Sequence, residues 1–251
     1  DLDVNSNIDY IQNNFRNIEG LYNPEFNRDW NIEAPTGNQI TSELGDQIFA
    51  VGGVQYLHRE KGNLNYQFQH LNFKDNYEGS RHVFFTKLNL QHFQVHSNSS
   101  FLETDGLNSN SVFYRSDNRL KYSYKKGWSG VEFSTEHNEK KEVELNQLDP
   151  VSQKFQAYEV FTAVGDSTKV FVKLGYRHRV NDSLQNNRLV KVNASDTYYL
   201  DSKWIQTQNT NLSLYANYRV FKSINASTPL QKSINSRLQY SQKLANNGVH
   251  L

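Results

Sequence analysis

The feature that most constrains the fold is a two-residue alternation of apolar and polar side chains between Lys169 and Lys222. In VFVKLGYRHRV (170–180) the Val, Leu and Tyr residues occupy even positions, whereas Lys173, Arg177 and Arg179 occupy odd positions. A helix would bring residues three and four positions apart onto one side and mix the two classes. The alternation therefore predicts β-strands with one apolar and one polar face.

The same alternation recurs in NLSLYANYRVF (211–221) and in SINSRLQYSQKL (233–244). In a sheet that crosses a membrane, the apolar positions contact lipid and the polar positions face the lumen. The lipid-facing candidates are Leu174, Tyr176, Leu212, Leu214, Tyr218, Leu238 and Tyr240. The lumen-facing candidates form a basic patch that would either attract acidic cargo or pair with neighbouring carboxylates, and they are Lys173, Arg177, Arg179 and Arg219.

The connections between these strands alternate in length. Short turns are expected near Glu60, Asn98, Lys126, Asp166, Asn209 and Asn247. Longer polar loops are expected between them, for example at residues 138–150, 181–196 and 222–232. Transmembrane β-barrels have short turns at one edge and longer loops at the other. The sequence thus predicts an all-β, antiparallel up-and-down meander of about eleven strands over residues 46–251, FLET (101–104) being the weakest, as part of a larger barrel.

Composition excludes several classes of protein. The 251 residues carry a formal net charge of +1 with Lys and Arg dispersed among carboxylates, so no nucleic-acid partner is expected. There is no Cys, which excludes disulfides and thiolate metal sites. The chain also lacks Met, and we read it as a processed chain or an internal piece of a longer protein. The low mean hydropathy of −0.78 is compatible with a barrel, because only alternate strand residues contact lipid.

Residues 1–45 differ from the rest, because their alternation is patchy and they contain two prolines. A short strand is expected near Leu2 to Ile11, followed by an irregular segment. Within EFNRDWN the residues Phe26, Arg28, Asp29 and Trp30 are expected to anchor this segment, with Trp30 and Phe26 buried and Arg28 paired to a carboxylate.

No motif for catalysis is present. The sequence has no Gly-rich phosphate loop, no G-x-S-x-G elbow, no H-E-x-x-H and no calcium loop. The histidines are scattered, and the acidic run between Glu132 and Glu144 is explained by a soluble, charged loop. We therefore expect no enzyme activity, no catalytic residues, no metal site and no cofactor.

EFNRDWN (25–31), preceded by Phe15-Arg16-Asn17-Ile18-Glu19, resembles segments of large Bacteroidota outer-membrane proteins of the SprA/Sov type. The specific resemblance covers residues 14–32. The remaining strands resemble those of Bacteroidota barrels only in being rich in Asn and Tyr. That family forms the giant barrel of the type 9 secretion translocon. The resemblance implies a polar-lumened barrel without catalytic residues, although this chain is far shorter.

These observations lead to two functional hypotheses. The first is an outer-membrane β-barrel protein, or part of one, in transport or protein secretion, with membrane lipid and other outer-membrane or periplasmic proteins as partners. The second is a soluble periplasmic or cell-surface β protein that acts as a binding or scaffold module, in which the apolar positions pack against a second sheet.

Overall fold

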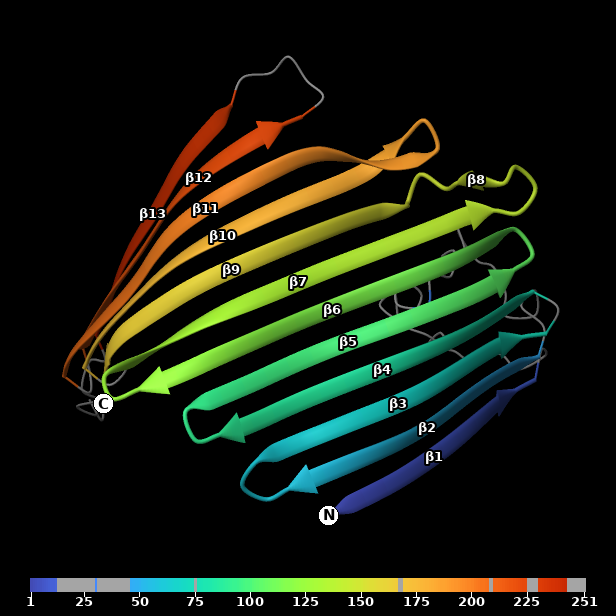
Figure 1. Ribbon diagram of the computed structural model, residues 1–251, viewed down its shortest axis with the longest axis horizontal. Coiled ribbons are helices and arrows are strands. Elements are labelled where there is room, and N and C mark those ends of the chain that lie inside the picture. Colours follow the sequence, from blue (N-terminus) through green and yellow to red (C-terminus); the bar gives the residue numbers. More distant parts are fainter. Residues whose placement is uncertain are drawn as a thin grey trace, which may run out of the picture.

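The computed structural model describes residues 1–12, 30, 46–74, 76–166, 169–207, 210–224 and 230–242. Their regular structure is β-strand throughout (Figure 1). No helix in these ranges is long and apolar enough to cross a membrane. The strands are β1 (Leu2–Ile11), β2 (Gln47–His58), β3 (Gly62–Phe73), β4 (Tyr77–Leu90), β5 (Phe93–Gly106), β6 (Ser109–Tyr124), β7 (Gly127–Glu142), β8 (Gln147–Leu148), β9 (Gln153–Asp166), β10 (Val170–Gln185), β11 (Arg188–Thr207), β12 (Thr210–Ser223) and β13 (Gln231–Gln242).

The strands form one sheet in which every pair is antiparallel. Each long strand pairs with its neighbours in the sequence, in the order β1 to β7 and then β9 to β13, while the two-residue β8 pairs only with β7. β1 and β13 are the edge strands. The predicted all-β, antiparallel up-and-down meander is therefore confirmed.

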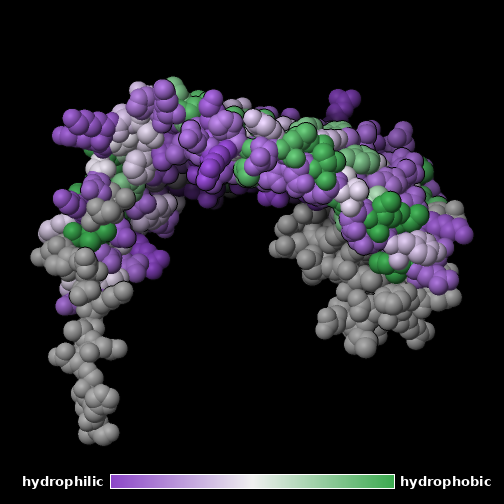
Figure 2. Space-filling model, turned by 90° about the horizontal axis from the view of Figure 1, so that it is seen from below, coloured by the Kyte–Doolittle hydropathy of each residue, from purple (hydrophilic) through white to green (hydrophobic). Residues whose placement is uncertain are grey.

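The sheet curves into an arch (Figure 2). Burial along β9 identifies the inner side of the curve. Ala157, Phe161 and Ala163 are 3%, 8% and 0% exposed, whereas Val160 and Val164 between and beside them are 50% and 52% exposed. The odd-numbered side chains of β9 are therefore crowded together on the concave side, and the even-numbered side chains point outward from the convex side.

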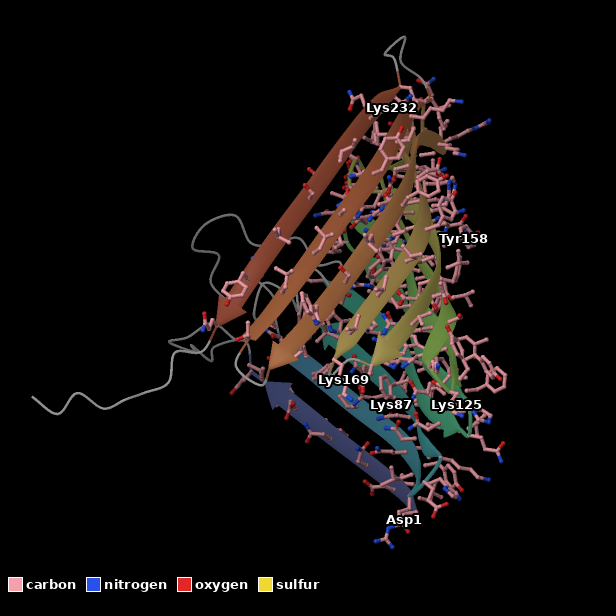
Figure 3. The ribbon with its side chains drawn as sticks, turned by 90° about the vertical axis from the view of Figure 1, so that its left-hand side faces the viewer. Asp1, Lys87, Lys125, Tyr158, Lys169 and Lys232 are labelled. Atoms are coloured by element: carbon pink, nitrogen blue, oxygen red, sulfur yellow. The ribbon has the colours of Figure 1, made fainter. Side chains whose placement is uncertain are left out.

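The two ends of the strands differ in their connections. At one end, which we call the short-turn edge, all five connections are short: residues 59–61, 91–92, 125–126, 167–169 and 208–209. The opposite end, the loop edge, has the long connections 12–46, 143–152 (which contains β8) and 224–230. Figure 3 shows Lys125 and Lys169 toward the short-turn edge and Lys232 at the opposite end.

Three connections at the loop edge are tighter than predicted. The loop expected at residues 181–196 is mostly strand, because β10 and β11 continue past the apolar band and are joined only by Asn186 and Asn187. Both residues have positive φ (50° and 58°), as a tight hairpin turn requires and as Asn tolerates. Likewise, only residues 107–108 join β5 to β6, and only residues 74–76 join β3 to β4.

One predicted turn is misplaced. Residues 97–100 were expected to turn because Ser and Asn are common in turns, but they lie within β5, which also includes FLET. Ser97 donates a hydrogen bond to Asn118 across the sheet (2.6 Å), and Ser99 and Ser116 are bonded at 2.7 Å. The chain instead reverses at residues 91–92, with Gln91 at φ 45°.

The main buried cluster lies on the concave side near the loop edge. It consists of Trp30, Leu71, Phe73 and Leu102, with Phe49, Tyr77 and Phe113 packed against it. The register places the strand residues of this cluster on the same face of the sheet as Ala157 and Phe161. Trp30 therefore covers the inner wall from within the arch.

Candidate functional site

The convex side of the sheet carries an apolar surface that crosses every long strand, and we call it the apolar face. Register places Leu174 beside Leu200 and Ala216, and Val4 beside Val54 and Tyr66. These side chains are open to solvent: Leu174 is 52% exposed, Val54 43% and Leu238 70%. No described part of the chain forms a second layer over this face.

Aromatic side chains gather toward both ends of the apolar face. Tyr176, Tyr198 and Tyr218 lie side by side near the loop edge, with ring centroids 5.1 and 6.4 Å apart. Near the short-turn edge, Phe93 contacts Tyr122 at 5.0 Å. The Tyr176 hydroxyl donates to Asp196 Oδ1 at 2.6 Å, beyond the apolar band. A ring on apolar surface with its hydroxyl directed to a polar rim is the arrangement that suits a membrane interface.

The distance between the two aromatic rows is of the same order as the apolar band of membrane barrels, which is about 25 Å tall. On β6, Tyr114 and Tyr122 are eight residues apart, which corresponds to roughly 27 Å of strand. Strands tilted by about 40°, as in membrane barrels, reduce this length to roughly 20 Å along the membrane normal. Within the described strands, charged side chains on this face appear only outside the two rows, for example Glu103, Glu139, Asp196 and Lys232.

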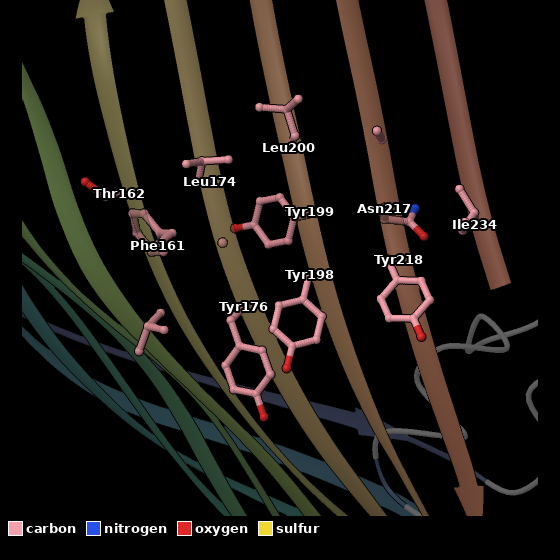
Figure 4. A pocket seen from close by; sticks show the side chains of 13 residues that line it. Phe161, Thr162, Leu174, Tyr176, Tyr198, Tyr199, Leu200, Asn217, Tyr218 and Ile234 are labelled. Carbon is pink, nitrogen blue, oxygen red and sulfur yellow. The ribbon is translucent and has the colours of Figure 1, made fainter. Parts of the chain in front are cut away.

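A shallow apolar depression of about 770 Å³ lies on the apolar face over β9 to β13 (Figure 4). It forms where the small Ala216 and Thr162 lie among larger side chains, including Leu174, Tyr176 and Leu200. Its lining is almost entirely apolar, with no charged residue. Such a surface suits acyl chains better than a polar substrate.

The concave side, which we call the polar face, carries ion pairs between neighbouring strands. Arg119 on β6 pairs with Glu132 on β7, and Arg115 lies 3.8 Å from Glu136. The sequence-based expectation that this acidic run belongs to a loop is wrong for these two glutamates, because β7 continues to Glu142. Their carboxylates compensate arginines of the inner wall.

Glycines and aromatic rings alternate along one row of the polar face. Register aligns Gly130, Phe161, Gly175 and Tyr199 across β7, β9, β10 and β11. A Cβ at Gly130 would be 2.5 Å from Phe161 Cζ, and one at Gly175 would be 2.2 Å from Tyr199 Cζ. Each ring therefore occupies the space above a neighbouring glycine, an arrangement that compensates for glycine in strands.

Lys173 lies among these rings and is neutralised. Its Nζ is 3.7 Å from Glu159 Oε1, and it lies 4.5 Å from the Phe161 centroid and 5.0 Å from that of Tyr199. The Tyr199 hydroxyl donates a hydrogen bond to the same Glu159 carboxylate. Lys173 is thus a structural ion-pair partner within the inner wall.

The structure separates the predicted site residues into two sets by face. Register puts Lys173, Arg177, Arg179 and Arg219 on the polar face. It puts Leu174, Tyr176, Leu212, Leu214, Tyr218, Leu238 and Tyr240 together on the apolar face. Leu174, Leu238 and Tyr240 are exposed, whereas Leu212, Leu214, Tyr176 and Tyr218 are half-buried.

Of the predicted anchor residues, Trp30 is 1% exposed, and its ring packs edge-on against Phe49 with centroids 5.8 Å apart. The Tyr77 hydroxyl donates a 2.6 Å hydrogen bond to the Trp30 carbonyl. Phe26, Arg28 and Asp29 lie outside the described residues.

Sequence reasoning missed the partners of the basic residues. Glu159 and Tyr199 were not singled out, and Glu132 was assigned to a charged loop, because pairing depends on which strand positions are opposite each other. The alternation of side chains was visible in the sequence, since Glu159 alternates with the valines of β9. Once the register is known, this alternation places Glu159, Tyr199 and Glu132 on the polar face.

In the described part of the chain, no group of three or more His, Asp or Glu side chains is placed to hold a metal ion. No protein-family model matches the sequence, and no curated protein matches it. Among solved structures, the chain is similar to the crystal structure of Pseudomonas aeruginosa OccK5 (OpdH), with a TM-score of 0.40 and 14% identity. The alignment covers 77% of this chain and 58% of that one, so this chain spans less than two thirds of that protein. A similarity at this level does not assign a function.

Proposed function

We propose that this chain forms part of the wall of an outer-membrane β-barrel that gives polar material a route across the membrane. The apolar face would contact lipid, and the polar face would line the aqueous interior. The observation that carries the proposal is the apolar face itself: it is exposed, has no charged side chain between the two aromatic rows, and is present on all twelve long strands, with uncharged Ser and Asn side chains among the apolar ones on β5 and β6.

The size of this surface argues against the soluble alternative. Monomeric soluble proteins rarely expose contiguous apolar patches larger than a few hundred Å². A soluble module would need a second sheet of similar extent to cover the apolar face. The described residues form one sheet only, and its apolar side chains are exposed along β1, β2, β10 and β13.

The edge strands support continuation of the wall. Leu2, Val4 and Ile8 on β1 are 68%, 69% and 72% exposed, and Ile234 on β13 is 77% exposed. The apolar alternation therefore reaches both edges unchanged. An unpaired edge inside a bilayer leaves backbone groups without hydrogen bonds, so we propose that both edges pair with further strands of a closed barrel.

Within this general role, we propose protein secretion as the specific one. The support is the resemblance of residues 14–32 to Bacteroidota translocon barrels, together with the position of Trp30 against the inner wall. Other outer-membrane or periplasmic proteins would then be its partners. A catalytic role forms no part of the proposal.

Detergent dependence tests the general proposal. The protein, refolded with and without detergent, is passed over a sizing column and then mixed with phospholipid vesicles. A barrel wall should aggregate without detergent and enter vesicles, where its β-structure resists protease. A monodisperse, folded protein in detergent-free buffer that does not bind vesicles would support the soluble module instead.

A further inference from the structure

Three arginines lie close together on the polar face, on the strands β10 and β12 near the β13 edge of the sheet, and we call Arg177, Arg179 and Arg219 the arginine cluster. Thr197 on β11 pairs with Arg177 on β10 and with Arg219 on β12, so the two arginines lie two strands apart in one row. That spacing is roughly 10 Å, and Arg179 is roughly 7 Å from Arg177 along β10. Arg177 and Arg219 both repel Arg179 electrostatically. Side chains of this length can converge on one small ligand.

The cluster differs from the other basic residues of the inner wall. Lys173, Arg119 and Arg115 each lie within 4 Å of a carboxylate, namely Glu159, Glu132 and Glu136. For Arg177, Arg179 and Arg219, no described carboxylate lies within that distance. Glu136 attracts Arg179 from further away but is paired with Arg115. Glu159 is opposite Arg177 in the register but pairs with Lys173. The cluster therefore holds three positive charges that form no ion pair with a carboxylate of the described chain.

Neutral groups hold Arg179 in place. Its Nε donates a 2.8 Å hydrogen bond to Asn181 Oδ1, and its guanidinium lies 4.2 Å from the centroid of Phe155. Neither contact neutralises the charge, and the terminal nitrogens have no partner among the described residues. Arg177 and Arg219 are exposed on the concave side. The Arg179 guanidinium is therefore held in place, and the charges of Arg177 and Arg219 are accessible from the interior of the arch.

We propose that the arginine cluster binds the oxyanion groups of a small solute, a carboxylate or a phosphate. Guanidinium groups present paired N–H donors that match the geometry of carboxylates and phosphates. An oxyanion between the three side chains would also relieve their mutual repulsion. Delivery of the solute to the cluster rests on the proposed barrel, but binding itself requires only the polar face.

Isothermal titration calorimetry with inorganic phosphate and with citrate tests the proposal, using the intact protein in the medium that keeps it monodisperse. We expect saturable binding of at least one probe in low salt. Each single substitution Arg177→Gln, Arg179→Gln or Arg219→Gln should weaken binding about tenfold, as loss of one charge-assisted hydrogen bond implies. The triple Gln variant should not bind. Raising KCl from about 50 to about 300 mM should weaken binding through screening.

A matched control is the double variant Arg119→Gln/Glu132→Gln, which removes a neutralised ion pair of β6 and β7 from the same wall. It should bind as the unchanged protein does. Absence of saturable binding of both probes, or equal binding by the triple Gln variant, would overturn the proposal. Arginine-dependent binding by a protein that fails to enter vesicles would keep the site and overturn the barrel. Insertion into vesicles without binding of either probe would overturn the binding site and keep the proposed barrel.

Discussion

The ring of Tyr199 on β11 lies directly over Gly175 on β10, so close that a Cβ at position 175 would be 2.2 Å from Tyr199 Cζ. Only a residue without a side chain fits beneath the ring. The ring in turn supports the Lys173–Glu159 ion pair, because the Tyr199 hydroxyl donates to Glu159 and Lys173 lies over the ring. A glycine thus determines how charges are held on the inner wall.

Gly175→Ala should therefore displace Tyr199 and lower the free energy of unfolding by about 1–3 kcal/mol, as overpacking of a filled site does. Chemical unfolding followed by tryptophan fluorescence measures the change. Gly52→Ala is the control, because nothing lies within 4 Å of a Cβ at position 52. Equal stability of the two variants would show that the ring does not depend on Gly175.

Trp30→Ala should lower the free energy of unfolding by about 3–5 kcal/mol, because it removes the largest fully buried side chain of the described residues. Trp30→Phe should cost less, since an aromatic ring still contacts Phe49. Both are measured by the same unfolding experiment. If Trp30 instead serves to dock a partner protein, Trp30→Ala would leave stability unchanged and release that partner.

Leu214→Arg should destabilise the membrane-inserted protein by about 2–4 kcal/mol, the cost of a cation at the lipid-facing midplane. Ser213→Arg should be tolerated, since Ser213 occupies the polar face of the same strand. Unfolding from lipid vesicles in urea measures both. Equal costs at the two positions would be incompatible with the assignment of faces.

Proteinase K added to intact cells should cleave at residues 143–146, where Val143 and Leu145 are 49% and 62% exposed at the loop edge. The two-residue turn at Asn186 and Asn187 should resist, because β10 and β11 hold it tightly. Residues 125–126 at the short-turn edge should be cut only after the outer membrane is permeabilised. Cleavage there in intact cells, with residues 143–146 spared, would reverse the orientation.

The faces of the strands were predictable because parity is a local property. Lys173 and Leu174 are neighbours in the sequence, and any extended strand separates them. The ends of the strands were less predictable. Outside the apolar band both faces are polar, so residues 181–185 look like a loop in the sequence although they continue β10.

Contacts between distant residues were not predictable. Ser97 and Ser99 have the composition of a turn, yet they satisfy their hydroxyls across the sheet with Asn118 and Ser116. The pairing of Gly175 with Tyr199 depends on register, which no local pattern specifies. The burial of Trp30 was expected, but its contact with Phe49 and Tyr77 required the folded sheet.

The most direct test of the central claim uses the absence of native cysteine. Single cysteines are placed at neighbouring positions on opposite faces: Val172 and Lys173 on β10, and Leu214 and Ser213 on β12. The protein is inserted into vesicles and treated with a membrane-impermeant maleimide and, separately, with a lipid-soluble one. We expect the water-soluble reagent to label Lys173→Cys and Ser213→Cys and the lipid-soluble reagent to label Val172→Cys and Leu214→Cys. Labelling of all four positions by the water-soluble reagent in vesicle-bound protein would contradict the claim that the apolar face contacts lipid.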